Sequence, residues 1–284
     1  MIENITISME EGPLNTTCEG EAVTFVTCFI SIYSKEPYEH KTFQWRIEFF
    51  EKMAKCGVYI CVYCCERTRP SIMALAEKYS NIKILELETP ITENIIHTTS
   101  YTSGLSYPER RNEAKDNTEY MSLMHDKIVY VHDAIQKNAW NTRIFAWFDF
   151  SMAYLFKNET VTFDKLVSLA FSCKYIDRFT AFPGCWPAVT SDTQDVLLKA
   201  IHWRFCGSFF MGDAVSLKEL YDLYCDYYPL FVAQYKKIVW EVNFWAWLES
   251  TSEWKPVWYA SDHNDRIINL PSSIFMENRP HIFV

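Results

Sequence analysis

A single carboxylate, Asp149, directly follows an apolar run at residues 143–148. The run has the length and apolarity of a buried strand, and open α/β sheets bind their ligands at the carboxyl ends of their strands. Asp149 could therefore face a ligand, or it could cap the segment that follows, as Asp often does. Ser151 stands two positions further on, where an Asp-x-Asp metal motif would have its second acid.

Glu241 opens an aromatic stretch with helical character at residues 240–249. A carboxylate in such a place could act as a general base toward a hydroxyl group. It could also complement the positive end of the helix dipole, which contributes a fraction of a kcal/mol. Residue type and position leave both interpretations open.

His263 lies between Asp262 and the pair Asn264 and Asp265. A histidine among carboxylates could contribute a ligand to Mn²⁺, and a solvated loop would have the same composition. Lys127 has two interpretations as well. It flanks the apolar face of a predicted helix, where it could add a positive charge to a phosphate site or extend its ammonium group to solvent.

The overall charge restricts the ligands that these residues could bind. Lys and Arg total 27 against 36 Asp and Glu residues, which gives a net charge of -9, and no Lys/Arg cluster stands out along the chain. Nucleic acid would be repelled by such a surface. The seven glycines form neither a G-x-G-x-x-G motif nor a P-loop, so a glycine-cradled nucleotide is not expected. A phosphorylated ligand would therefore need a divalent cation held by carboxylates.

The elements that must position these residues alternate in the first part of the chain. Apolar runs of strand length are separated by segments with apolar residues at helical spacing, which predicts βαβ units and a mostly parallel sheet. The predicted elements are a strand at 22–33, a helix at 43–55, a strand at 58–64, a helix at 71–79 and a strand at 82–87.

The next part of the chain begins with a polar, charge-rich segment at residues 93–118. Its length and lack of a period predict a surface loop, and loops of this length commonly cover or bind ligands. Further elements follow: a helix at 119–140, a strand at 143–148, a helix at 163–170, a strand at 178–182, a turn at Pro183-Gly184, an apolar run at 205–212 and a helix at 217–227.

Residues 1–20 form a polar segment without an apolar leader, and no stretch of the chain is long and apolar enough to span a membrane. The ten cysteines lie mainly in apolar runs, where reduced thiols act as small hydrophobic groups. We therefore expect a soluble, cytoplasmic protein without a transmembrane segment. Residues 21–284 are predicted to form one domain.

Five ordered segments resemble the HtrL/YibB-like family of proposed glycosyltransferases, which have a GT-A-type fold. They are TFVTCF, a helix that carries Lys127, WFDFS, CGSFFMGD and WEVNFWAWLE, and the resemblance covers roughly residues 23–265. It implies a single GT-A-like, Rossmann-like α/β domain with a mixed, mostly parallel sheet. This sequence departs from the usual pattern at Ser151 and at the CGS that precedes Phe209.

The resemblance also implies roles for individual residues. Asp149 would take the metal and sugar-donor position, with His263 as a second ligand to Mn²⁺ or Mg²⁺. Glu241 is the first candidate for the catalytic base and Asp213 the second. The residues expected to bind the sugar donor are Thr27, Lys127, Asp149, Ser151 and Gly207.

The predicted function is a metal-dependent glycosyltransferase that moves a sugar from a UDP- or GDP-linked donor to a glycan or another hydroxyl acceptor. In such a site the cation stabilises the charge on the leaving nucleotide. The alternative is a non-catalytic protein that keeps the fold and binds a nucleotide or a glycan. A phosphotransferase that does not act on sugars is a third interpretation.

Overall fold

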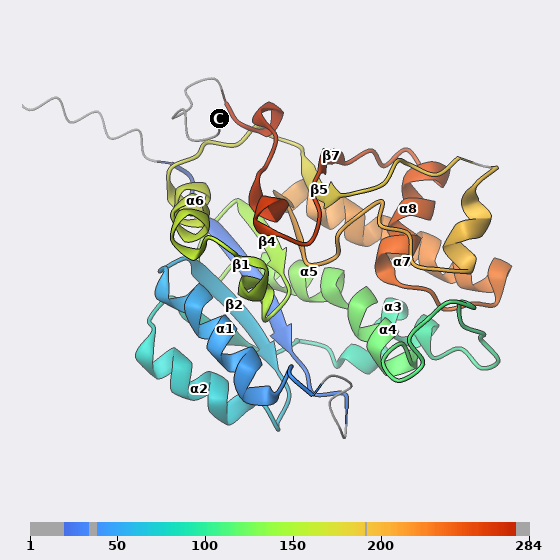
Figure 1. Ribbon diagram of the computed structural model, residues 1–284, viewed down its shortest axis with the longest axis horizontal. Helices are drawn as coiled ribbons and strands as arrows, with labels where there is room; N and C mark the ends of the chain where they lie inside the picture. Colours follow the sequence, from blue (N-terminus) through green and yellow to red (C-terminus); the bar gives the residue numbers. More distant parts are fainter. Residues whose placement is uncertain (1–19, 34–38, 191, 277–284) are drawn as a thin grey trace, which may run out of the picture.

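The structure is a computed structural model that describes residues 20–33, 39–190 and 192–276. Its centre is one seven-stranded sheet with the strand order β3-β2-β1-β4-β6-β5-β7 (Figure 1). The predicted polar segment at residues 1–20 lies outside the described residues except for Gly20.

The first part of the chain alternates strands and helices in the order βαβαβ, and its strands are parallel. Strand β1 pairs with β2, and β2 pairs with β3, all in parallel. Each helix separates two strands, as the alternating sequence pattern predicts. The elements are β1 (Val23–Phe29), α1 (Phe43–Lys55), β2 (Tyr59–Cys64), α2 (Arg69–Lys78) and β3 (Ile82–Leu85).

The remaining elements complete both the sheet and its second helical layer. They are α3 (Ile95–Ser100), α4 (Thr118–His125), α5 (Lys127–Lys137), β4 (Ile144–Phe148), α6 (Glu159–Phe171), β5 (Thr180–Gly184), β6 (Phe209–Asp213), α7 (Ala214–Tyr235), α8 (Glu241–Thr251) and β7 (Val257–Ala260).

Strand β6 makes the sheet mixed. It runs antiparallel to β4 on one side and to β5 on the other, whereas β4 is parallel to β1 and β7 is parallel to β5. The start of β6 therefore lies at the same edge of the sheet as the end of β4. The predicted α/β class with a mixed, mostly parallel sheet is confirmed.

Strand β4 shows why the core strands are apolar at every position. Ile144, Ala146 and Phe148 belong to a core that also contains apolar side chains of α1, α2 and α6. Phe145 and Trp147 point to the opposite face and pack in a second core with α5, α7 and α8. Because both faces are covered by helices, alternation between apolar and polar residues disappears.

Several predicted boundaries were wrong. The segment predicted as a loop at 93–118 contains the short helix α3, and the helix predicted at 119–140 is divided at Asp126 into α4 and α5. Pro183 and Gly184 were predicted as a turn but belong to β5. The glycine is needed there because a Cβ would lie 1.7 Å from the carbonyl oxygen of Arg204.

Two further expectations concern membranes and thiols. Of the helices in the described part of the chain, none combines the length and apolarity that a membrane crossing requires. The nine cysteines within the described ranges are all free thiols.

Candidate active site

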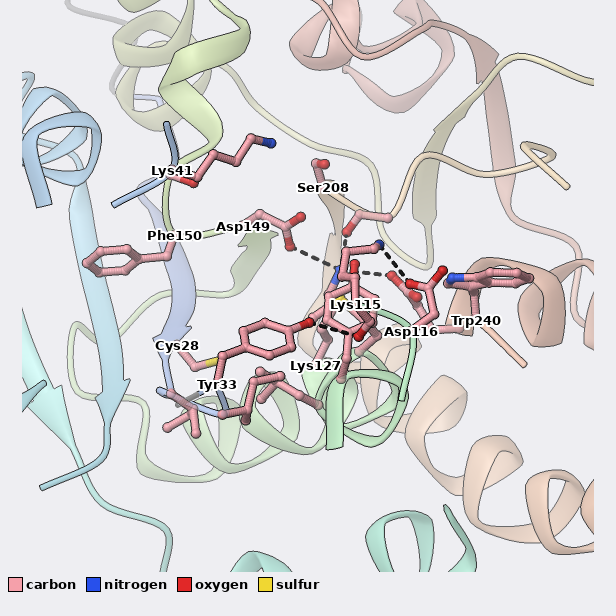
Figure 2. Close-up of a pocket in the computed structure, with 18 of the residues that line it drawn as sticks. Cys28, Tyr33, Lys41, Lys115, Asp116, Lys127, Asp149, Phe150, Ser208 and Trp240 are labelled. Carbon is pink, nitrogen blue, oxygen red and sulfur yellow. Dashed lines mark hydrogen bonds and ion pairs between the residues drawn. The ribbon is translucent and has the colours of Figure 1, made fainter. Parts of the chain in front are cut away.

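A pocket of about 640 Å³ opens where β1 and β4 end. This volume is within the range of small-molecule sites, about 300–1,000 Å³. Its lining includes residues 28–33, which are the end of β1 and the segment after it, and residues 149–151, which follow β4. Gly207 and Ser208, which precede β6, and residues 240–242 at the start of α8 line it as well (Figure 2).

Lys127 is the most deeply buried charged residue of this lining. Its side chain is 1% exposed, and its Nζ atom lies 3.0 Å from Asp149 Oδ1 and 2.8 Å from Glu241 Oε1 (Figure 2). Nζ also donates a hydrogen bond of 2.8 Å to the carbonyl oxygen of Gly207. These three acceptors match the three N–H groups of an ammonium ion.

The two carboxylates keep Lys127 charged. Burial by itself would lower the pKa of its ammonium group, but the negative charges of Asp149 and Glu241 outweigh burial and raise that pKa above its ordinary value. The possibility that Lys127 extends to solvent was therefore wrong. Sequence reasoning missed this burial because both partners come from distant segments.

Of the two carboxylates that contact Lys127, that of Asp149 is the more accessible to solvent. Its side chain is 37% exposed, and Oδ1 accepts a hydrogen bond of 3.0 Å from Trp147 Nε1 in addition to its contact with Lys127. The short helix that follows has Ser151 as its cap residue. The position of Asp149 at the strand end thus matches the ligand-facing interpretation better than the capping one.

Glu241 is the first residue of α8, and its side chain is only 6% exposed. A carboxylate at a helix N-terminus is favoured by the dipole, so this interaction and the contact with Lys127 occur together. Gly207 permits the arrangement, because a Cβ on it would lie 2.2 Å from Glu241 Oε1.

Two of the predicted site residues, Thr27 and Asp213, are not part of the pocket lining. Thr27 is fully buried inside β1, opposite Val62 of β2, and is not part of the pocket lining. The lining begins at the next residue, Cys28.

Asp213 ends β6, opposite Ile144 at the start of β4, and therefore lies at the other edge of the sheet from Asp149. Its Oδ1 accepts hydrogen bonds from the N–H groups of Val215 and Ser216, so it caps α7. Asp213 therefore has a structural role at the edge of the sheet opposite to the pocket, and we do not retain it as a candidate base.

Ser151 and His263 do line the pocket. His263 Nδ1 lies 3.3 Å from Asp262 Oδ1, and its ring packs edge-on against Trp203. In the residues that the structure describes, no group of three or more His, Cys, Asp or Glu side chains is placed to hold a metal ion. The ammonium of Lys127 contacts Oδ1 of Asp149, one of the two ligands that the sequence predicts. The cation stays a prediction.

The pocket is strongly basic, which sequence reasoning did not predict. Among the described residues that line it, seven are Lys or Arg and three are Asp or Glu. Three of the basic residues come from the charge-rich loop, which was predicted to bind ligands, and the others are scattered along the chain. The basic lining consists of Lys41, Arg46, Arg67, Arg110, Arg111, Lys115 and Lys127.

The fold and the pocket define an α/β protein with a basic, ligand-sized pocket at the carboxyl edge of a mixed sheet. Residues 22–238 match the model of a family described as "Bacterial protein of unknown function (HtrL_YibB)". The chain belongs to this family, which confirms the family predicted from the ordered motifs.

The solved structures that match this chain share little sequence with it. One is the 4-diphosphocytidyl-2C-methyl-D-erythritol synthase from Anaerococcus prevotii, with 9% identity, a TM-score of 0.41 and coverage of 86% of this chain and 88% of that chain. Another is mouse xyloside xylosyltransferase 1 in its apo form, with 8% identity, a TM-score of 0.46 and coverage of 85% of each chain. The comparison with curated proteins produced no match.

Proposed function

We propose that this protein transfers a sugar from a UDP- or GDP-linked donor to a hydroxyl group of an acceptor such as a glycan. The observation that carries the proposal is the buried Lys127 ammonium, which joins Asp149 and Glu241 in a predominantly basic pocket. The diphosphate of a nucleotide sugar is negatively charged, and it gains charge as the bond to the sugar breaks. Preorganised positive charge stabilises such a transition state.

The two carboxylates have different roles in this proposal. In an inverting transfer, the acceptor hydroxyl gives its proton to Asp149 while its oxygen bonds to the anomeric carbon. The bond from that carbon to the diphosphate breaks, and the electron pair leaves with the nucleoside diphosphate. Asp149 is chosen because its side chain is 37% exposed, against 6% for Glu241. Glu241, the base predicted from the sequence, instead positions Lys127.

A divalent cation is not part of this proposal. The predicted ligand Asp149 has an ammonium group 3.0 Å from one oxygen, and a second cation beside it would be repelled. The prediction of Mn²⁺ or Mg²⁺ at Asp149 and His263 is tested separately below.

The test is the release of nucleoside diphosphate from a panel of UDP- and GDP-sugars by the full chain. Hydrolysis without an acceptor is measured first, because it needs only the sugar donor, and glycans are then added. We expect release from at least one sugar nucleotide, and strong loss of release in the Asp149→Asn variant. Absence of both binding and release across the panel would overturn the proposal.

The same panel separates the alternative function. A non-catalytic protein would bind UDP or GDP, which raises its apparent stability by mass action, but would release no nucleoside diphosphate from any sugar donor. Binding combined with turnover supports the enzyme.

A further inference from the structure

Six basic residues line the pocket besides Lys127, and we call this set the basic wall: Lys41, Arg46, Arg67, Arg110, Arg111 and Lys115. Lys41 and Arg46 lie at the start of α1, Arg67 follows β2, and the other three belong to the loop before α4. The wall is therefore assembled at the carboxyl edge of the sheet from segments that are distant in the sequence. Figure 2 shows Lys41 and Lys115 among the residues that line the same pocket as Asp149.

Neutral groups contact two of these cations, Arg67 and Lys41. Arg67 donates hydrogen bonds to Ser31 Oγ at 3.1 Å and to the carbonyl oxygen of Tyr33 at 3.4 Å. The Lys41 ammonium lies 4.7 Å from the ring centre of Tyr154. Contacts with hydroxyl, carbonyl and aromatic groups orient a cation without cancelling its charge, so the wall remains attractive to an anion.

Within the described part of the chain, carboxylates lie close to two of the wall's cations. Lys115 pairs with Asp116 at 2.9 Å, and Arg111 lies 3.8 Å from Glu113. Burial, and then the like charges of Arg46 and Lys115, lower the pKa of Lys41. Lys41, Arg46 and Lys115 are thus close enough to repel one another in the free protein, and a bound anion would relieve this repulsion.

We infer that the basic wall binds the diphosphate of the nucleotide directly, so that nucleotide binding needs no divalent cation. This inference rests on the proposed function. Among the described residues that line the pocket, positive charges exceed negative charges by four. This excess is enough to neutralise the negative charge of a diphosphate. The sequence-based reasons for a cation were the net charge of -9, the lack of a Lys/Arg cluster along the chain and the lack of a glycine-rich loop. The fold supplies a set of basic residues in the pocket.

Calorimetry of UDP, GDP and inorganic pyrophosphate with the full chain tests the inference. Titrations are run in EDTA and again with Mn²⁺. We expect UDP or GDP to bind in EDTA with an affinity within about threefold of that with Mn²⁺, a difference of about 0.7 kcal/mol. We also expect pyrophosphate to compete with the nucleotide. Binding that requires Mn²⁺ would overturn the inference and leave the proposed function intact. Absence of binding in both buffers would overturn the inference, and would overturn the proposed function as well if no sugar nucleotide releases nucleoside diphosphate.

Variants of the wall locate the binding. Lys41→Met and Arg110→Ala should each weaken nucleotide binding in EDTA by about 10-fold or more, because hydrogen bonds to charged groups contribute about 1.5–3 kcal/mol. Lys41→Arg keeps the charge and should retain most of the affinity. The control is Lys174→Ala, an exposed residue outside the pocket lining, whose affinity should not change.

Melting temperatures of all four variants identify any that fail to fold. Arg110 is exposed, so its replacement should leave the fold intact even if Lys41→Met does not. Unchanged affinity in folded Lys41→Met and Arg110→Ala proteins would contradict the inference.

Discussion

The ammonium nitrogen of Lys127 lies 2.8 Å from Glu241 Oε1, although the two residues are 114 positions apart. Each is the first residue of its helix, α5 or α8. The contact therefore fixes two helix starts against each other beside Asp149. Because both side chains are buried, loss of the Lys127 charge would leave Glu241 without this partner in a region of low dielectric constant. Loss of the Glu241 charge would leave Lys127 with Asp149.

Asp149→Asn should reduce transfer by about 10²–10⁴-fold, the usual effect of losing a general base. The fold should be retained, because the amide oxygen can still accept from Trp147 and Lys127. Steady-state kinetics and calorimetry of the same preparation measure this. Nucleotide binding that becomes insensitive to Mn²⁺ only in this variant would instead support the cation predicted at Asp149 and His263.

Glu241→Gln should lower both stability and activity, but activity less than Asp149→Asn does. The amide keeps an acceptor for Lys127 and loses the negative charge, so we expect a loss of about 1–3 kcal/mol in the free energy of unfolding. Denaturant unfolding and kinetics measure the two effects. If Glu241→Gln reduces turnover more than Asp149→Asn, the base is Glu241 after all.

The matched control for Glu241 is Glu249, a second buried carboxylate in α8. Glu249 Oε1 and Oε2 accept hydrogen bonds of 2.7 and 2.8 Å from Arg204, and neither residue lines the pocket. Glu249→Gln should destabilise the protein by a comparable amount without changing nucleotide affinity. A similar loss of affinity in both variants would attribute the effect of Glu241 to general destabilisation.

Gly207→Ala should disturb the contact between Lys127 and Glu241, because the new Cβ would lie 2.2 Å from Glu241 Oε1. Overpacking of this kind typically costs about 1–3 kcal/mol. Adding Glu241→Asp shortens the acid by one methylene and should restore part of the stability. A double-mutant cycle in denaturant unfolding measures the coupling, and simple additivity of the two changes would contradict the proposed clash.

His125 should make stability depend on pH. Burial lowers its pKa from 6.5 to about 3, while its Nδ1 accepts from Tyr224 and its Nε2 donates to the carbonyl of Val239. Between these pH values the unfolded chain binds a proton that the folded chain does not. The free energy of unfolding should therefore fall as the pH falls through this window, by up to about 1.4 kcal/mol per pH unit.

His125→Gln removes this titration while keeping polar atoms at the position. Its free energy of unfolding, measured in urea at pH 5 to 7, should vary less with pH than that of the unaltered protein. Equal slopes would show that His125 does not contribute to the acid sensitivity.

Much of the architecture follows from the sequence because it depends on local pattern. Apolar runs such as residues 143–148 predict strands covered on both faces, and the helical spacing at 43–55 predicts α1 with its observed bounds. The position of Asp149 at a strand end is equally local, since it needs only the end of β4. Local pattern does not reveal strand direction, so β6 could not be predicted to run antiparallel.

Only the tertiary structure decided the charges of the pocket. Whether Lys127 extends to solvent or is buried depends on which carboxylates pack against it, and Glu241 reaches it from another helix. The scattered residues Lys41, Arg67 and Arg110 form a basic wall only because parallel strands end at one edge of the sheet. A chain with a net charge of -9 can therefore contain a basic pocket. The net charge is a sum over the whole chain, whereas a bound ligand interacts mainly with the charges within a Debye length of it.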